Sequence, residues 1–424
     1  MDASLGGDLT SIVSARRIVL VSPGWPRSAF ANGIVSYVDN TKRGLEAAGS
    51  EVRIAAYAIA PGGEDAAVIG GSFSRRNALA RLATRATWKL APKLAKRAFG
   101  HLDVSTGLRN VYRDWPFDVA EIEESRGESL WAARAVPVPI VVRLHGPWFL
   151  NAPARGVPED AAFDRLVARE GRAIERAEGL SSPSRDVLER VRQRYGLRLP
   201  DAVVIPNPGP EPEPRQLWSR ERAEPGLILF VGRFDRHKGG DLVVDAFVKL
   251  ASAGRRVRLV MTGRDDGVVD DTGRRWSFPE YLAARVPPEQ RGSIAFLGQV
   301  DPEKLAELRR RANVVLFTSR YENFPLTLLE ALAQACPLVC ADAGSCTEIV
   351  EDGRNALVFR AGDAGALAER IGVLLDHPER AAALAAQGLA DYRARFLPAA
   401  IARVTLELYG EVLARRRASA GRSR

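Results

Sequence analysis

The chain has 424 residues, of which 46% are hydrophobic and 27% are charged. This length exceeds one ordinary hydrophobic core, so two globular domains are expected. No apolar run approaches the ~18 residues that a membrane-spanning helix needs. The first fifteen residues contain Asp2 and Asp8 and lack the basic start of a signal peptide, so we expect a cytoplasmic protein.

The net charge is +9, which favours anionic partners: nucleic acid, anionic lipid or phosphorylated substrates. The three cysteines, Cys336, Cys340 and Cys346, lie in one short segment without a nearby histidine. They are too few for a metal site, so we expect buried thiols in a reducing compartment.

The first half of the chain alternates between short apolar runs and longer amphipathic segments, a pattern typical of a parallel sheet covered by helices. A loop rich in glycine and proline, residues 22–32, separates the first strand from a helix that begins near Gly33. The expected strands are residues 18–21, 51–57, 117–121, 140–144 and 202–205, and the expected helices are residues 33–48, 159–178 and 184–195.

A basic stretch, residues 75–97, contains eight arginines and lysines and no acidic residue. Leucines and Trp88 interleave with the cations, which predicts an amphipathic helix, kinked at Pro92, on the inner face of an anionic membrane. The alternative is an excursion of the first domain with a solvated basic face. The tail from Arg415 to Arg424 is a second basic cluster.

Five prolines within residues 206–214 indicate a linker, because proline neither continues a helix nor donates within a central strand. The alternating pattern then restarts. It predicts strands at 227–231, 257–262, 294–297, 314–317 and 337–341, and helices at 240–252, 302–312, 326–334 and within 364–395. The predicted organisation is a first domain over 1–206, a linker over 207–214, a second domain over 215–397, and a segment 398–424 whose helix crosses back to the first domain.

The strand at 227–231 ends in a glycine-framed loop with two cations. Gly232 frees the backbone, and Arg233 and Lys238 leave the same strand end. An arginine can hold two phosphate oxygens in parallel, and a lysine adds a compact charge. The alternative is a loop with solvated bases. Asp235 and Arg236, between the two cations, are expected to pair with one another.

Two glutamates, Glu322 and Glu330, stand eight residues apart after the strand at 314–317. Glu330 lies among apolar residues of the following helix and can accept two hydrogen bonds from a ribose diol. The alternative for Glu330 is a helix-surface charge. Glu322 precedes the helix and can bind sugar hydroxyls or stabilise a cationic sugar.

The start of that helix predicts a phosphate cradle. The backbone N–H groups of Asn323, Phe324 and Leu326 are available to phosphate oxygens. Pro325 suits the first helical turn, where an N–H would lack a partner in any case.

The two motifs, in this order, resemble the donor half of the GT-B glycosyltransferases of family 4, the group 1 type. The Glu-x7-Glu motif of that family corresponds to Glu322 and Glu330, and its Gly-Arg and Lys-Gly pairs correspond to 232–233 and 238–239. Similarity is thin between residues 60 and 115. It extends to residues 296–298 and 344–353, and in the first half to 32–33, 143–146, 181–184 and 205–207.

The resemblance implies an α/β GT-B fold, two Rossmann-like domains with a cleft between them. It also implies retaining sugar transfer from a nucleoside-diphosphate sugar without a metal. Arg233 and Lys238 would hold the diphosphate, Glu330 the ribose and Glu322 the donor sugar.

Two residues of the first half enter through the same resemblance. His145 would face the sugar from the first domain, although a histidine at a strand end is as often structural. Gly33 would let the N–H groups of its helix approach the diphosphate.

The sequence departs from the family pattern at several positions. The usual Glu-Gly-Phe-Gly is Glu-Asn-Phe-Pro here, Asn32 replaces a frequent glycine, and Thr347 replaces a frequent proline. Asn323 tolerates the left-handed backbone that a glycine provides.

The sequence therefore predicts a glycosyltransferase that uses a nucleotide-sugar donor, an acceptor that the sequence does not identify, and no further cofactor. The alternatives are another GT-B enzyme, either a nucleotide-sugar epimerase or a phosphorylase, and a non-catalytic binding protein.

Neither a metal site nor a nucleic-acid site is expected. No Asp-x-Asp sequence occurs, and the pairs 265–266 and 270–271 are interpreted as surface acids. The narrow band of bases lacks the aromatic-interleaved face of a single-strand binder.

Overall fold

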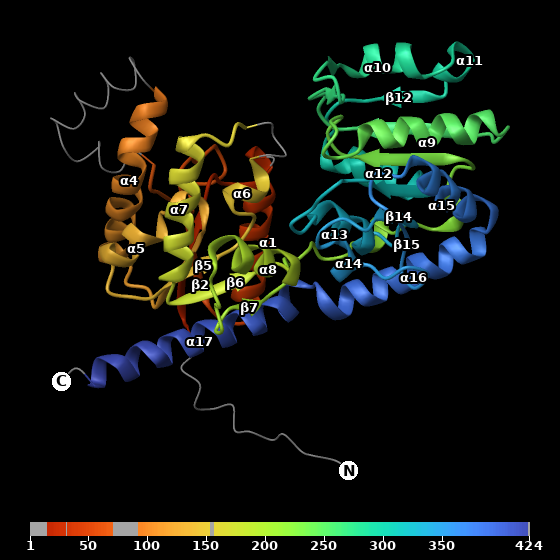
Figure 1. Cartoon of the computed structure of the whole chain (residues 1–424). Coiled ribbons are helices and arrows are strands. Elements are labelled where there is room, and N and C mark those ends of the chain that lie inside the picture. The colour runs from red at the N-terminus through yellow and green to blue at the C-terminus, as the bar shows by residue number, and fades with distance from the viewer. Residues whose placement is uncertain (1–14, 31, 71–91, 153–156, 423–424) are drawn as a thin grey trace. The chain divides into compact units, whose positions relative to one another are not determined.

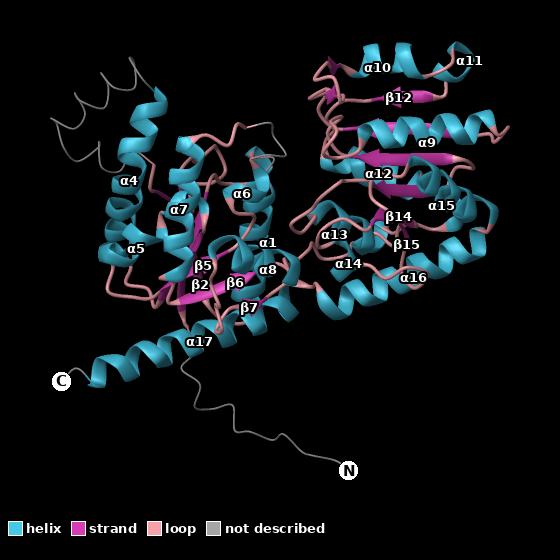
Figure 2. Cartoon of the chain, viewed as in Figure 1, coloured by secondary structure: helices cyan, strands magenta, loops and turns pink. Residues whose placement is uncertain are grey.

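The chain divides into two compact units, each built on a parallel sheet with helices on its faces (Figures 1 and 2). The computed structural model describes residues 15–30, 32–70, 92–152 and 157–422. The first unit comprises residues 1–183, 187–208 and 398–424, and the second comprises residues 184–186 and 209–397. Both units are Rossmann-like, so the predicted α/β fold class is confirmed.

In the part of the first unit that the structure describes, seven parallel strands form one sheet in the order β3-β2-β1-β4-β5-β6-β7. The switch from β1 to β4 at the centre of this order is typical of a doubly wound sheet. The strands are β1 Arg17–Ser22, β2 Glu51–Ala56, β3 Ala67–Val68, β4 Val119–Glu123, β5 Ile140–Arg143, β6 Gly179–Ser182 and β7 Val203–Val204.

The C-terminal helix α17, Pro398–Arg422, packs against α1, Gly33–Ala47, within the first unit. Val38 and Leu45 of α1 share a buried cluster with Ile401 and Val412 of α17. The other described helices of this unit are α4 Pro92–Asp114, α5 Ser129–Ala135, α6 Trp148–Asn151, α7 Ala161–Glu175 and α8 Arg185–Tyr195.

The second unit contains a six-stranded parallel sheet in the order β12-β9-β8-β13-β14-β15. Its strands are β8 Leu227–Val231, β9 Arg258–Thr262, β12 Ile294–Phe296, β13 Val314–Phe317, β14 Leu338–Ala341 and β15 Leu357–Phe359, and a hairpin joins β10 Val268–Val269 to β11 Arg275–Trp276. Its helices are α9 Gly240–Ser252, α10 Phe278–Arg285, α11 Pro288–Arg291, α12 Pro302–Arg311, α13 Leu326–Ala333, α14 Cys346–Ile349, α15 Ala364–Asp376 and α16 Pro378–Arg395.

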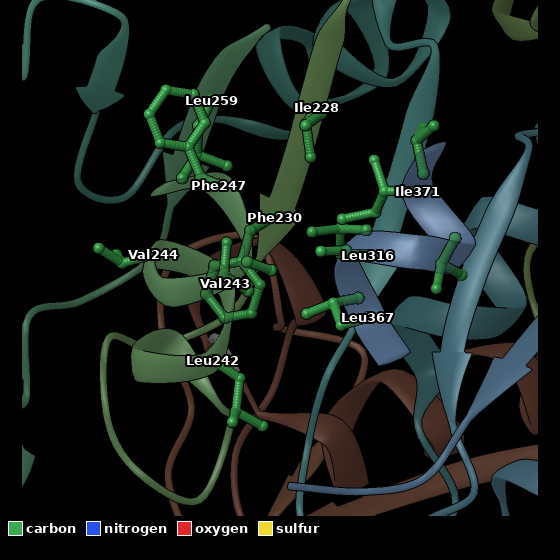
Figure 3. Packing of buried hydrophobic residues seen from close by; sticks show 14 of the residues in the cluster. Ile228, Phe230, Leu242, Val243, Val244, Phe247, Leu259, Leu316, Leu367 and Ile371 are labelled. Atoms are coloured by element: carbon green, nitrogen blue, oxygen red, sulfur yellow. The ribbon is translucent and has the colours of Figure 1, made fainter. Parts of the chain in front are cut away.

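The central strands of the second sheet are buried on both faces, which explains their unbroken apolar sequences. Ile228, Phe230 and Leu316 face a cluster that includes α9 and α15 (Figure 3). Leu229 and Val315 point to the opposite face and join a second cluster that includes α13 and α16. This double burial fixes the register of β8 and β13, and therefore the positions of the loops that follow them.

Most of the predicted elements are present, but three strands of the two sheets were missed: β3, β6 and β15. Two of them have only two or three residues, and β6 reads Gly-Leu-Ser-Ser, which carries no β-branched or aromatic signal. The strand predicted at 117–121 is β4, shifted by two residues. Phe117 is buried but precedes the strand.

The predicted membrane-binding helix lies largely outside the described residues. Residues 75–91 are not described, and residues 92–97 begin α4. Within the described chain, no helix combines the length and the hydropathy that crossing a membrane requires.

The contact between α1 and α17 can be tested at Gly44. A β-carbon there would lie 2.4 Å from the carbonyl oxygen of Pro398. Ala normally stabilises a helix interior by about 1 kcal/mol relative to Gly, but this clash should reverse the sign and cost about 1–3 kcal/mol. We expect Gly44→Ala to lower Tm, whereas Gly33→Ala, with no atom within 4 Å of its β-carbon, should leave Tm unchanged. A rise in Tm for Gly44→Ala would refute the packing of α17 on α1.

Candidate functional site

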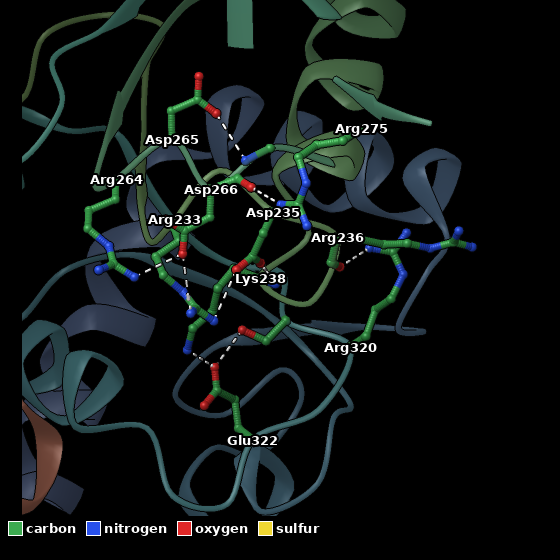
Figure 4. A network of polar contacts seen from close by, with 12 residues as sticks. Arg233, Asp235, Arg236, Lys238, Arg264, Asp265, Asp266, Arg275, Arg320 and Glu322 are labelled. Carbon is green, nitrogen blue, oxygen red and sulfur yellow. Dashed lines mark hydrogen bonds and ion pairs between the residues drawn. The ribbon is translucent and has the colours of Figure 1, made fainter. Parts of the chain in front are cut away.

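Two loops meet at one edge of the second sheet. Strands β8 and β13 are parallel neighbours, so their carboxyl ends lie side by side. The loop after β8 carries Arg233 and Lys238, and the loop after β13 carries Glu322. Figure 4 shows these side chains gathered at this edge, where open α/β sheets bind ligands. The structure therefore brings these three predicted site residues together.

The two loops are fixed to each other through the backbone. The Thr318 hydroxyl donates to the carbonyl oxygen of Lys238 at 2.9 Å. The N–H of Arg320 donates to the carbonyl oxygen of His237 at 2.8 Å. Gly239 has φ +75°, and a β-carbon there would lie 2.2 Å from the Thr318 carbonyl oxygen, so only glycine fits between the loops. Contacts within the protein thus fix the two loops relative to each other.

Arg320 adds a charged clamp that the sequence analysis missed. Its guanidinium donates to both carboxylate oxygens of Asp241, at 2.9 and 2.6 Å, and also contacts the carbonyl oxygen of Arg236. Asp241 lies in the first turn of α9, so the clamp ties the loop after β13 to the helix that follows β8. No pattern around Arg320 distinguishes it from a solvated base.

Arg233 lies between two carboxylates. Its guanidinium is 3.0 Å from Asp235 and 3.4 Å from Asp266, and Arg264 contacts the same Asp266 at 2.9 Å. The Arg233 side chain is about one third exposed, at 31%. These carboxylates hold an accessible guanidinium in one orientation, as anion binding requires.

Lys238 and Glu322 form an ion pair, and the hydroxyl of Ser319 donates to the same carboxylate oxygen at 2.6 Å. Burial raises the pKa of Glu322, but the Lys238 ammonium and the Ser319 hydroxyl outweigh burial and lower the pKa overall. Glu322 is therefore ionised at neutral pH. The pair places a negative charge directly beside the cation proposed for the diphosphate.

The expected pairing of Asp235 with Arg236 is wrong. Asp235 accepts the backbone N–H of Lys238 at 2.6 Å and pairs with Arg233, whereas Arg236 pairs with Asp271 at 2.6 Å. The side chain of Asp235 therefore points into the loop, and that of Arg236 points toward the hairpin.

The remaining hairpin acids organise turns. Asp265 accepts the N–H groups of Gly267 and Phe278, at 3.1 and 2.8 Å. Asp270 accepts the N–H of Thr272 at 2.9 Å and the indole N–H of Trp276 at 2.8 Å. Over the described chain, no cluster of three or more histidine, cysteine or acidic side chains is arranged to hold a metal ion.

Glu330 lies on α13 and is paired with Arg309 of α12 at 2.8 Å. Its side chain is partly exposed, at 22%, whereas that of Arg309 is almost fully buried, at 4%. Glu330 is thus more than a solvated helix-surface charge. Its partner Arg309 is a buried residue that no sequence motif indicated.

The start of α13 differs from the prediction in two details. Pro325 is the N-cap, with an extended ψ of 108°, and the helix begins at Leu326 rather than with the proline in its first turn. Asn323 is not among the described residues with positive φ, so it does not replace the left-handed glycine.

The ring of Phe324 is buried and packs on Phe396, with centroids 6.2 Å apart, so its side chain belongs to the core. Gly232 donates its N–H to the Thr262 carbonyl oxygen at 2.9 Å.

His145 follows β5 in the first unit. Its N–H and that of Gly146 donate to the two carboxylate oxygens of Glu124, at 2.9 and 2.8 Å. Its ring packs edge-on against Tyr37 of α1, with centroids 4.7 Å apart. Burial, and secondarily the charge of Arg143, hold the pKa of His145 well below its usual value. The imidazole is therefore neutral at pH 7.

Gly33 is the first residue of α1, in the same unit as His145. The Asn32 side chain caps the helix by accepting the N–H of Ile34 at 2.8 Å, which gives a physical reason for asparagine at this position. A β-carbon on Gly33 would meet no atom within 4 Å. Because Tyr37 lies one turn further along α1 and contacts His145, both predicted residues lie at one end of this unit.

A group of acidic residues, which the sequence analysis missed, supports the His145 loop. Glu124 holds the loop backbone directly, and Glu170 accepts the N–H groups of Trp148 and Arg126, both at 2.9 Å. Burial raises the pKa of Glu124 and of Glu170 to about 7. The pKa of Glu123 is also raised to about 7, by burial and then by the charges of Glu124 and a further glutamate.

These carboxyls make stability fall as pH rises. Their folded-state pKa of about 7 exceeds the ordinary value of 4.5, so the folded state binds more protons, and stability is lost as pH rises through about 7. We expect Glu123→Gln to raise Tm by a few degrees at pH 8, corresponding to about 1–3 kcal/mol, with little effect at pH 5. Thermal unfolding from pH 5 to pH 8 measures this difference. The exposed control Glu189→Gln should show no such trend, and equal behaviour of the two variants would argue against the buried acidic group.

Comparison with known proteins now places the chain in a family. Residues 216–390 match the family model described as "Glycosyl transferases group 1", and residues 32–208 match the "Glycosyl transferase 4-like domain". The match over residues 32–208 ends within the proline-rich segment, the match over residues 216–390 begins just after it, and together they span most of the chain. The chain belongs to the GT-B glycosyltransferases of the group 1 family, so the resemblance stated from the sequence is confirmed.

Individual relatives are distant. A D-inositol 3-phosphate glycosyltransferase of Acidothermus cellulolyticus is 30% identical over 277 residues, which cover 62% of this chain and 59% of that protein. A glycogen synthase of Mycobacterium tuberculosis is 26% identical over 291 residues, or 67% of each chain.

Solved structures share the fold over nearly the whole chain. The sucrose-phosphate synthase of Thermosynechococcus elongatus has a TM-score of 0.67 at 19% identity, covering 94% of this chain and 99% of that one. Anabaena HepE, solved with UDP-glucose, has a TM-score of 0.61 at 17% identity, with the same coverage. At these identities the likeness shows the fold alone.

Proposed function

We propose that the protein transfers a sugar from a nucleoside-diphosphate sugar to an acceptor hydroxyl, with retention of configuration and without a metal ion. The observation that carries this proposal is the cluster of Arg233, Lys238 and Glu322 at the carboxyl edge of a Rossmann-like sheet, in a chain of the group 1 family. Two accessible cations and one carboxylate match a ligand with a diphosphate at one end and a sugar at the other.

The diphosphate would bind by exchanging partners with protein carboxylates. Asp235 and Asp266 hold Arg233, and Glu322 holds Lys238. Phosphate oxygens would take over these cations, whose positive charge stabilises the charge that develops on the leaving diphosphate. The desolvation of the cations is already partly compensated by these carboxylates, so little rearrangement is needed.

The proposed reaction needs no general base from the protein. The bond between the anomeric carbon and the β-phosphate oxygen breaks, and its electron pair stays on the diphosphate. The acceptor oxygen then bonds to the anomeric carbon on the same face, and its proton passes to a β-phosphate oxygen. Glu322, ionised at neutral pH, would stabilise the oxocarbenium-like transition state.

His145 and Gly33 are proposed as ligand-binding residues of the first unit. The neutral imidazole of His145 offers one hydrogen-bond donor and one acceptor to sugar hydroxyls. The open space at Gly33 leaves room for an anion beside the first N–H groups of α1.

The relatives favour a uridine diphosphate sugar as the first donor to test. HepE was solved with UDP and with UDP-glucose. Two relatives are named for different products or acceptors: one is a glycogen synthase and the other a D-inositol 3-phosphate glycosyltransferase. We therefore propose a hydroxyl acceptor without naming the molecule that carries it. Association of residues 75–97 with an anionic membrane surface stays a prediction.

Arg233 provides a direct test with a matched control. We expect Arg233→Met to lower kcat/KM at least a hundredfold, because one of the two cations for the leaving diphosphate is lost. Arg264→Met removes a more exposed arginine that shares the same Asp266 and should retain near-normal activity. Nucleoside diphosphate release from a panel of nucleotide-sugars measures both. Equal activity of the two variants would contradict the assignment.

The stereochemistry separates the proposal from the alternative reactions. Proton NMR of the product should show the anomeric configuration of the donor, with turnover unchanged by EDTA. A new sugar formed without acceptor would indicate an epimerase, and an inverted product would overturn the retaining mechanism.

A further inference from the structure

Glu330, the carboxylate proposed for the ribose, is held by an arginine from the protein interior. Arg309 lies in the last turn of α12 and is 3% exposed. Its Nη2 donates to Oε2 of Glu330 at 2.8 Å. Arginine is almost never buried without a partner, because removing its charge from water costs several kcal/mol. The pair is therefore the contact that keeps this guanidinium in place.

The two neighbouring arginines on α12 behave differently. Arg310 contacts the carbonyl oxygen of Arg215 at 3.1 Å, and Arg311 pairs with Glu224 and Glu307 near the surface. Successive helical residues project about 100° apart, so only one residue of the Arg-Arg-Arg run can face the sheet. Arg309 is therefore the inward-facing residue of the run, and the other two arginines are partly exposed.

The surroundings of Arg309 are apolar. Its helix neighbours Leu308 and Ala312 belong to a cluster that contains Leu329 and Cys336, and the Cys336 thiol lies 3.9 Å from the Arg309 carbonyl oxygen. An interaction between charges is strong in such surroundings. The guanidinium therefore restricts the rotamer of Glu330 more firmly than a solvated partner could.

We propose that Arg309 is a positioning residue for nucleotide binding: by holding Oε2 of Glu330, it keeps the carboxylate oriented toward the ribose diol. The inference rests on the proposed function, in which Glu330 accepts the ribose hydroxyls. Without Arg309, Glu330 can turn toward water, and its hydrogen bonds to the two hydroxyls weaken. The effect should be confined to ligands that carry those hydroxyls.

The test compares each nucleoside diphosphate with its 2′,3′-dideoxy analogue. Calorimetry with the uridine, guanosine and adenosine compounds first identifies the pair that binds the wild-type protein. We expect the wild type to prefer the ribose form about tenfold or more, because hydrogen bonds to a charged group are strong. In Arg309→Met this preference should fall to about twofold or less, and Arg309→Lys should restore part of it. Arg311→Met, on the same helix, should keep the wild-type preference.

The outcomes distinguish the positioning role of Arg309 from the ribose-binding role of Glu330. An unchanged preference in Arg309→Met, whatever its Tm, would show a purely structural arginine and overturn the inference alone. No preference in the wild type would overturn the ribose role of Glu330 and the inference with it. If Arg309→Met does not fold, Arg309→Lys decides: a preference reduced several-fold supports the inference, and the wild-type value rejects it.

Discussion

The ion pair between Lys238 and Glu322 is the interaction on which the donor site depends. It joins two loops from adjacent strands and keeps a partly buried carboxylate ionised. The same lysine is the cation proposed for the diphosphate, so the Lys238 ammonium would interact with both the ligand and the Glu322 carboxylate. Asp235 and Asp266 stand in the same relation to Arg233. Both cations of the site are therefore paired with carboxylates, which hold them in place.

The precision of this arrangement comes from the scaffold around it. Double-sided burial of β8 and β13 sets the register, Gly239 permits the close approach of the loops, and Arg320 clamps one loop to α9. Arg309 holds Glu330 in the same way. Each proposed ligand-binding charge thus has a partner from a different element, which limits the conformations it can adopt before binding.

The sequence predicted the fold and the positions of the two motif-bearing loops well, because long buried strands and glycine-framed loops leave strong local patterns. It could not predict partners far apart in the chain: Arg309 with Glu330, Arg320 with Asp241, or Glu124 with the His145 loop. The Asp235 error has a different origin: the carboxylate binds the Lys238 backbone and Arg233, both within three residues, instead of the adjacent Arg236. Short strands such as β6 were not predicted because tertiary pairing, and not residue type, holds them in the sheet.

The claim that Lys238 serves both Glu322 and the diphosphate is tested most directly by the affinity of the nucleoside diphosphate for Lys238→Met and Glu322→Gln, measured by calorimetry. Lys238→Met should weaken binding about tenfold or more, because a charged hydrogen-bond donor to phosphate is lost. Glu322→Gln should bind as tightly as the wild type or more tightly, since the competing carboxylate is gone, yet it should transfer no sugar. A loss of affinity in Glu322→Gln equal to that in Lys238→Met would contradict the account.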